Sequence, residues 1–313
     1  MIEYENLLKN TKVYKILDND IKNGFLSHCN MIISEDEVAC RNLCLLVARD
    51  ILCKNDNCGK CKDCLDVENN VHEGLIIPES LNSEGIKDLI NRSYAMVDSD
   101  SKVVLINNFN DIDLSLQNKF LKLIEEPSGN TVFILGVIKP TNVLETIKSR
   151  SNKLTIEAFN EDDLKNALKD KYDPYNLYKA ILFCEGSLTK ALMILSDDKI
   201  IGCYESMKII LLNMKKSTNV VDYMSQLDIS KTKGYLDALE IIIKQVIERK
   251  TGLSKNNEED IDSLAQEYAL TTLVNIEELV INSKKMLEQN VGTEGVLFKL
   301  LMNILEVKYK CQI

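Results

Sequence analysis

Apolar, strand-like runs alternate with amphipathic, helix-like runs through the first half of the chain. We expect strands near Asn30–Ile33, Leu75–Ile77, Val103–Ile106, Val132–Leu135 and Lys153–Ile156. Helices are expected between them, near Asp36–Leu52, Ser83–Val97, Leu114–Glu125 and Thr141–Lys148. Strands that are separated by crossover helices pair in parallel, so this alternation predicts an α/β domain with a parallel sheet.

The strand signal ends near residue 158, and the remaining segments repeat apolar residues at helical spacing. Between 159 and 198 these segments are short, and Gly186 separates two of them, which predicts a small helical domain. From 199 to 313 the amphipathic segments are longer, which predicts a third domain that is all α. The predicted division is therefore 1–158, 159–198 and 199–313.

Composition excludes some classes of protein. With 313 residues, 45% of them hydrophobic, the chain can bury the cores of two or three domains. Its 38 basic and 48 acidic residues give a net charge of -10, which disfavours a surface that binds nucleic acid broadly. No run of eighteen apolar residues occurs, and the opening "MIEYENLLKNTK" is not signal-like, so we expect a soluble cytoplasmic protein.

Four of the ten cysteines crowd into the segment "CKNDNCGKCKDC", namely Cys53, Cys58, Cys61 and Cys64. A CxxC turn presents two sulfurs to one ion, and four thiolates complete the tetrahedral shell of Zn. The spacing predicts one structural zinc ion per chain, without an open position for a catalytic water. An iron–sulfur cluster is the alternative, although the fourth cysteine lies upstream and no Cys-Pro follows.

The stretch "NKFLKLIEEPSGNTVFIL", Asn118–Leu135, closely resembles the "NALLKTLEEPP" segment of bacterial clamp-loader subunits, which are relatives of the AAA+ ATPases. Two further motifs agree: "IKSRS" (Ile147–Ser151) is similar to the Ser-Arg-Cys motif of this family, and "EGSLTKAL" (Glu185–Leu192) to its lid helix. The resemblance covers roughly Ile16–Leu195. It implies an AAA+-like domain with a zinc module, then an all-α lid and an all-α collar for oligomerisation.

The segment "MIISEDEVACRN", Met31–Asn42, stands where such a protein would carry its phosphate loop. A working loop needs glycines that let backbone N–H groups approach phosphate, a lysine, and a hydroxyl for Mg²⁺. None of that arrangement is present. Ser34 and Glu37 instead have the spacing of a capping box, and residues 35–37 are acids at the positive end of the predicted helix. We expect this helix end to repel a triphosphate.

Three other departures from the ATPases of the family point the same way. Asn107 and Asn108 replace the Asp-Glu pair that would hold Mg²⁺ and prepare water. Val137 and Ile138 replace a polar sensor, and Thr189 corresponds to the lid arginine. Together these replacements predict a subunit without an ATPase site of its own.

Arg150 in "SRS" is retained. In the family this arginine lies at the subunit boundary and points into the ATP site of the neighbour, so the resemblance implies an arginine finger that acts in trans. The alternative is a cation that answers the dipole of a helix C-terminus. Ser151 replaces the usual cysteine of the motif. Glu125 and Glu126 are expected to be structural, because adjacent helix residues point in different directions and Pro127 ends the helix.

The resemblance implies a non-hydrolysing subunit of the DNA polymerase III clamp loader, which helps to load the sliding clamp on primed DNA during replication. Its implied partners are the gamma/tau ATPase subunits, the delta subunit and, through the complex, the sliding clamp and primed DNA. Polymerase activity would reside in the complex. Two alternatives remain open: an active gamma/tau-like ATPase, and a zinc-containing scaffold unrelated to replication.

Overall fold

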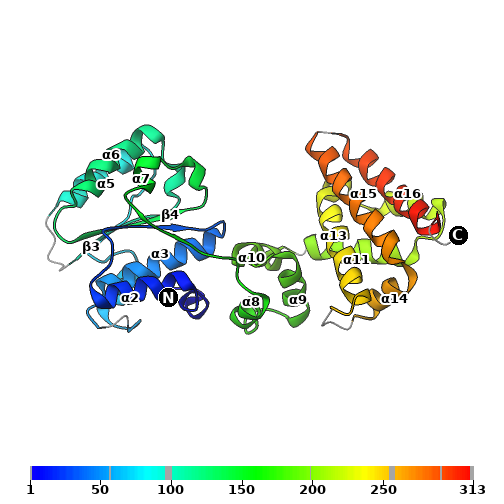
Figure 1. Cartoon of the computed structure of the whole chain (residues 1–313), viewed down its shortest axis with the longest axis horizontal. Helices are drawn as coiled ribbons and strands as arrows, with labels where there is room; N and C mark the ends of the chain where they lie inside the picture. The colour runs from blue at the N-terminus through cyan, green and yellow to red at the C-terminus, as the bar shows by residue number, and fades with distance from the viewer. Residues whose placement is uncertain are drawn as a thin grey trace. The chain divides into compact units, whose positions relative to one another are not determined.

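The computed structural model describes residues 2–55, 58–95, 101–197, 199–253, 258–289 and 291–310. The chain divides into two compact units, of which the first comprises Met1–Leu177 with Cys184–Ala191 and the second Tyr178–Phe183 with Leu192–Ile313. The first unit contains the sheet. The described residues of the second unit form helices and no strand (Figure 1). The predicted three-domain division, with boundaries at 158 and 198, stays a prediction.

A five-stranded parallel sheet organises the first unit. Its strands are β1 (Cys29–Ile33), β2 (Leu75–Ile76), β3 (Lys102–Ile106), β4 (Thr131–Val137) and β5 (Asn152–Thr155), in the spatial order β2-β3-β4-β1-β5. Strand β1 lies between β4 and β5, with Met31 opposite both Leu135 and Lys153. The central strands are apolar along nearly their whole length because both faces of the sheet are covered.

Helices pack on both faces of this sheet. The helices of the first unit are α1 (Glu5–Lys9), α2 (Lys12–Asn23), α3 (Glu37–Leu52), α4 (Lys62–Glu68), α5 (Ser83–Tyr94), α6 (Leu114–Glu125), α7 (Glu145–Lys148) and α8 (Glu161–Leu168), with 3-10 turns η1 (Phe109–Asp111) and η2 (Pro140–Asn142). One apolar cluster joins α2 and α3 to the sheet, and another joins α5, α6 and α7 to its opposite face (Figure 1). This is the predicted α/β architecture.

The second unit is a helical bundle. Helices α9 (Pro174–Phe183) and α10 (Leu188–Ser196) contribute their later residues to it, and its remaining elements are α11 (Lys199–Asn213), α12 (Ser217–Gln226), η3 (Ile229–Lys231), α13 (Thr232–Lys250), α14 (Glu259–Glu267), α15 (Leu270–Glu288) and α16 (Thr293–Lys310). Lys179 is fully buried in this unit, with Nζ 3.0 Å from Glu258 Oε1 and 4.0 Å from the centre of the Tyr204 ring. Burial lowers the pKa of Lys179 despite its carboxylate partner.

The expected helix over 141–148 is wrong in its first half, where the chain forms η2, two extended residues and then α7. The buried Gln117 side chain explains the break: its amide donates to Asn142 O at 2.9 Å, and its oxygen accepts from Leu144 N at 3.0 Å. Backbone groups that a helix would pair internally are thereby held by α6. The expected helix over 83–97 ends at Tyr94, and residues 96 and 97 lie outside the described part.

A search of the described helices finds none that combines the length and the apolar character needed to cross a membrane.

Candidate functional site

The start of α3, directly after β1, is closed by an acidic side chain. Asp36 is the N-cap residue, and its Oδ1 accepts a hydrogen bond from Ala39 N at 3.0 Å. The predicted capping box of Ser34 and Glu37 is wrong, because Glu37 is already the first helical residue and Ser34 Oγ accepts from Asp36 N, also at 3.0 Å. The acid at position 36 therefore satisfies the helix end, as such residues commonly do.

Residues before and within α10 close the same helix end from the other side. The Thr189 hydroxyl donates to Asp36 Oδ1, Thr189 N lies 3.2 Å from the same carboxylate, and Ser187 Oγ donates to Oδ2 at 3.1 Å. Val38 N in turn donates to Thr189 Oγ1 at 2.9 Å. The N–H groups of Val38 and Ala39, which in a phosphate-binding helix would point at the anion, thus already have partners within the chain.

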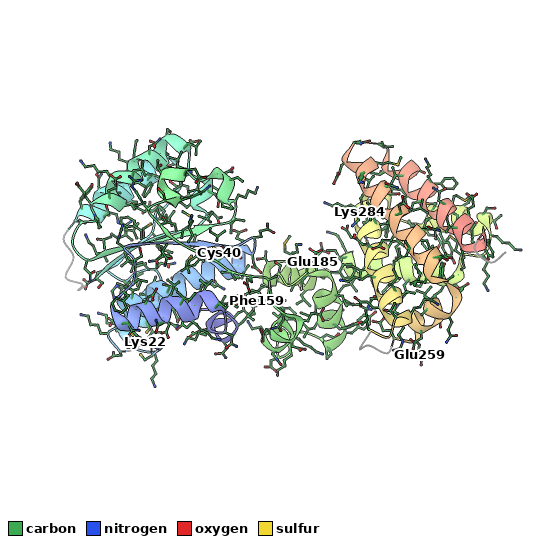
Figure 2. All side chains as sticks on the ribbon, in the orientation of Figure 1. Lys22, Cys40, Phe159, Glu185, Glu259 and Lys284 are labelled. Atoms are coloured by element: carbon green, nitrogen blue, oxygen red, sulfur yellow. The ribbon has the colours of Figure 1, made fainter. Side chains whose placement is uncertain are left out.

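A close backbone contact brings these residues to the helix end. Phe159 N donates a hydrogen bond to Gly186 O at 2.8 Å. Figure 2 labels Phe159 and also Glu185, the residue before Gly186. Gly186 has φ +78°, and a Cβ at this position would lie 2.6 Å from Phe159 O. Only glycine fits this turn without displacement of the backbone. The turn therefore fixes where Ser187 and Thr189 meet Asp36.

A pocket of about 490 Å³ lies beside this closed helix end. Its acidic lining residues are Glu35, Asp36, Glu157 and Glu185, and Lys190 also lines it. Lys190 Nζ pairs with Glu185 at 2.5 Å, so a carboxylate already neutralises that cation. The pocket therefore presents a net negative lining, which disfavours a triphosphate.

The other positions at which an ATPase would hold catalytic groups carry amides and apolar side chains. Asn108 Nδ2 lies 3.5 Å from Glu37 Oε1, and the buried Oδ1 of Asn107 has no hydrogen-bond partner in the described part of the chain. Val137 is buried at the end of β4. Ile138 N donates to Asn110 Oδ1 at 2.7 Å. These groups supply neither a carboxylate ligand for Mg²⁺ nor a general base.

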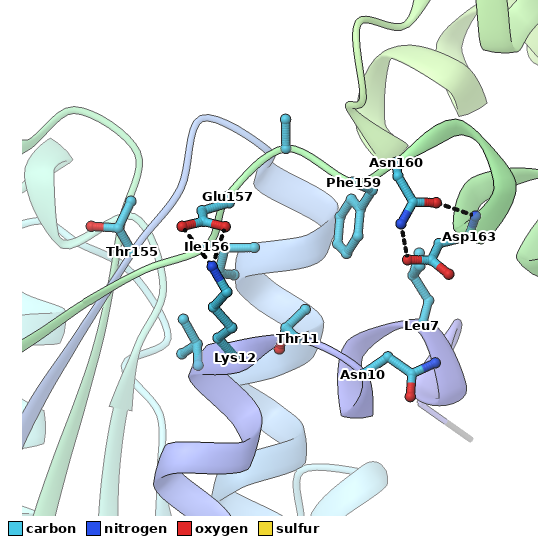
Figure 3. Close-up of a pocket in the computed structure, with 12 residues that line it drawn as sticks. Leu7, Asn10, Thr11, Lys12, Thr155, Ile156, Glu157, Phe159, Asn160 and Asp163 are labelled. Carbon is cyan, nitrogen blue, oxygen red and sulfur yellow. Dashed lines mark hydrogen bonds and ion pairs between the residues drawn. The ribbon is translucent and has the colours of Figure 1, made fainter.

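A second, smaller pocket of about 240 Å³ lies between the turn that joins α1 to α2 and the segment after β5 (Figure 3). Lys12 Nζ reaches Glu157 Oε2 at 3.1 Å across it, and both side chains are mostly exposed. Asn160 caps α8 at its rim by accepting from Asp163 N. An exposed ion pair of this kind contributes little to the stability of the fold.

Arg150 lies just after α7, at the surface of the first unit. Its Nη1 donates to Thr146 O at 3.1 Å, and its Nη2 lies 2.7 Å from Glu125 Oε1 at the end of α6. The Arg150 side chain is 41% exposed. The pairing of Glu125 with Arg150 could not be predicted from the sequence, because the two residues are far apart in the chain and neither motif indicates it.

The residue that follows Arg150 is anchored in the sheet. The Ser151 hydroxyl donates to Ile147 O at 2.8 Å and lies 3.2 Å from Cys29 Sγ, at the start of β1. Burial raises the pKa of the Cys29 thiol to about 11, which keeps it neutral in this contact. Ser151, the departure from the cysteine of the resembled motif, thus still fixes the turn that carries Arg150.

The four clustered cysteines come together between α3 and α4. Their sulfur atoms all lie within 4.8 Å of one another, and Cys53 Sγ is 3.7 Å from Cys61 Sγ. Four sulfurs at about 2.3 Å from one zinc ion would be separated by about 3.8 Å, so the cluster fits a single tetrahedral ion. Cys61 N also donates to Cys58 Sγ at 3.3 Å, a contact that favours a thiolate.

A buried arginine fixes the elements around this cluster. Arg49, on α3, is 1% exposed and lies 2.7 Å from Glu68 Oε1 on α4 and 2.6 Å from Glu5 Oε1 on α1. Two carboxylates therefore compensate the buried guanidinium, as such a group requires. The three helices next to the cysteines are held together by these pairs.

Known proteins are similar to the part of the chain that contains these features. The family model described as "DNA polymerase III, delta subunit" matches residues 9–160, which include the sheet, the cysteine cluster and Arg150. The curated protein "DNA polymerase III subunit delta'" of Bacillus subtilis is 22% identical over 320 aligned residues, which span 94% of this chain and 96% of that protein. The chain is thus similar to a DNA polymerase III delta' subunit over nearly its whole length.

Further similarities lie outside the delta' subunits. The gamma/tau subunit of DNA polymerase III from Mycobacterium tuberculosis is 28% identical, over 34% of this chain and 20% of that protein. A solved gamma subunit-related protein from Thermotoga maritima has a TM-score of 0.42 and 18% identity, over 94% of this chain and 99% of that one. The predicted resemblance to clamp-loader subunits is confirmed by the delta' relatives.

Proposed function

We propose that this chain is a non-hydrolysing subunit of the DNA polymerase III clamp loader and helps to place the sliding clamp on primed DNA. The observation that carries the proposal is the Asp36 carboxylate at the start of α3, hydrogen-bonded to Ser187 and Thr189. A nucleotide phosphate would have to displace this carboxylate and then tolerate the acidic pocket beside it. The resulting repulsion supports a subunit without ATPase activity of its own.

In this proposal Arg150 acts on a neighbouring subunit. An exposed guanidinium, held on a turn that is anchored in the sheet, suits a residue that must reach a phosphate across a subunit boundary. The neighbour is a gamma/tau ATPase subunit, and the delta subunit completes the assembly. The chain works in the cytoplasm, with lid and collar domains over 159–198 and 199–313, and reaches clamp and DNA through the complex.

The four cysteines hold one structural zinc ion in this proposal. The ion supplies a fixed link between α3 and α4, and the four sulfurs of Cys53, Cys58, Cys61 and Cys64 fill its coordination shell. The separation of 3.7 Å between two of the sulfurs favours one ion over an iron–sulfur cluster, in which several irons separate the sulfurs.

An omission experiment tests the proposed function. Gamma/tau and delta subunits are mixed with the full chain, and transfer of labelled clamp to primed circular DNA is measured by gel filtration. The complete mixture should load the clamp, and the mixture without this chain should fall to background. Equal loading with and without the chain, or failure of the chain to co-elute with the other subunits, would favour the zinc-containing scaffold unrelated to replication.

A further inference from the structure

Two groups from different helices hold the guanidinium of Arg150. Thr146 O, on α7, accepts from Nη1 at 3.1 Å, and the Glu125 carboxylate, on α6, lies 2.7 Å from Nη2. A guanidinium carries five N–H donors in a rigid fork, so these two contacts leave donors for a phosphate. The side chain is thus oriented and still has capacity to bind an anion.

The pair between Glu125 and Arg150 is poorly suited to stabilise the fold. Both side chains are more than two fifths exposed, and exposed ion pairs contribute about 0.2–1 kcal/mol. Its larger consequence is conformational. An unrestrained arginine has many accessible rotamers, and a side chain that is already held loses less of this rotamer entropy when it meets its target.

The carboxylate of Glu125 is itself well placed to act as a fixed point. Glu125 is the last residue of α6 and directly follows Leu123 and Ile124, whose side chains are buried. The next residue, Glu126, is also exposed but takes no part in any ion pair found in the described part of the chain. Glu126 therefore offers an adjacent exposed carboxylate without the ion pair to Arg150.

We propose that Glu125 is a positioning residue for Arg150, holding the guanidinium in the orientation from which it reaches the ATP of the neighbouring subunit. The inference rests on the proposed role of Arg150 and adds a second residue to it. Glu125 touches no substrate and acts only through the arginine.

The test is Glu125→Gln in the full chain, assembled with the gamma/tau and delta subunits. Glutamine keeps the length of the side chain and removes its charge. Loss of an exposed pair should lower kcat at the ATP site next to this subunit by about two- to fivefold, measured as the slow phase of single-turnover hydrolysis. The KM for ATP should stay unchanged, because the arginine acts on the transition state. The melting temperature should also stay unchanged, which separates positioning from a structural role.

Two controls sharpen this experiment. Glu126→Gln removes the same charge from the neighbouring residue and should leave kcat at the wild-type value. Glu125→Gln should have no additional effect when Arg150 is already alanine, because the carboxylate then has nothing to position. A further decrease in that double variant would overturn the inference, since Glu125 would be acting independently of Arg150.

The outcome also distinguishes this inference from the proposed function. If Arg150→Ala leaves ATP hydrolysis unchanged, the arginine finger is wrong, and the role of Glu125 fails with it. If Arg150→Ala lowers the rate while Glu125→Gln retains the wild-type kcat or raises it, the finger stands and the positioning role alone is overturned.

Discussion

Arg150→Ala is expected to slow ATP hydrolysis at the site next to this subunit by roughly 10³-fold, without preventing assembly. An arginine that is supplied in trans stabilises the charge that develops on the transferring phosphate, and such residues contribute about 10³ to 10⁵ in rate. The partners that hold Arg150 in the free chain are a backbone carbonyl and an exposed carboxylate, so their loss costs little stability.

The measurement is single-turnover hydrolysis by the assembled loader in the presence of clamp and primed DNA. The loader has other ATP sites that keep their normal rate, so the total rate of hydrolysis falls only by the contribution of the affected site. In a single turnover the affected site appears as a separate slow phase, whose amplitude gives the fraction of ATP bound there. Lys153→Ala, which removes an exposed cation three residues away, is the matched control and should keep the wild-type rate. Arg150→Lys should recover part of the rate only, because an ammonium lacks the forked donors. An unchanged rate in the assembled Arg150→Ala loader would remove the finger.

Cys61→Ser is expected to abolish stable zinc binding and to loosen the segment between α3 and α4. Loss of an outer-shell partner alone weakens metal affinity by about 10- to 100-fold, so loss of a ligand should cost more than about 100-fold. Because a structural zinc contributes folding free energy where it binds, the cysteine segment should become sensitive to protease. The sheet should keep its far-UV circular dichroism, since neither of its apolar clusters includes any of the four zinc-binding cysteines.

Elemental analysis of anaerobically purified protein checks the metal prediction. The wild-type chain should carry about one zinc ion, bound by four sulfurs. Cys203→Ala is the control, because Cys203 is a buried cysteine of the second unit and should leave the zinc content unchanged. Iron in the wild-type protein, or zinc that persists in Cys61→Ser, would contradict the assignment.

The sheet could be predicted from the sequence because its strands are short apolar runs, as expected for a sheet that is covered by helices on both faces. The expected strand over 103–106 differs from β3 by one residue, and the expected helix over 114–125 coincides with α6. The break before α7 could not be predicted, because it depends on Gln117, a side chain about 25 positions away, holding the backbone. Helix α4 was not predicted, because its seven residues are too few to show a clear amphipathic pattern beside the cysteines.

The expectation that the chain lacks a working phosphate loop rests on the residues themselves, since neither glycine nor lysine occurs where they would be needed. The identity of the cap could not, because Ser34 and Asp36 are both good capping residues and only the first helical residue decides between them. The contact of Thr189 with Asp36 joins residues 153 positions apart and leaves no local trace. The pairing of Glu125 with Arg150 is of the same long-range kind.

Titration of the isolated full-length chain with a fluorescent, nonhydrolysable ATP analogue and Mg²⁺ tests the central claim most directly. A gamma/tau ATPase subunit serves as the positive control. With Asp36 and its hydrogen-bonded partners at the start of α3, we expect no saturable binding up to about 1 mM, which corresponds to less than about 4 kcal/mol of binding free energy. Saturable binding in the micromolar range would show that this helix end accepts phosphate after all.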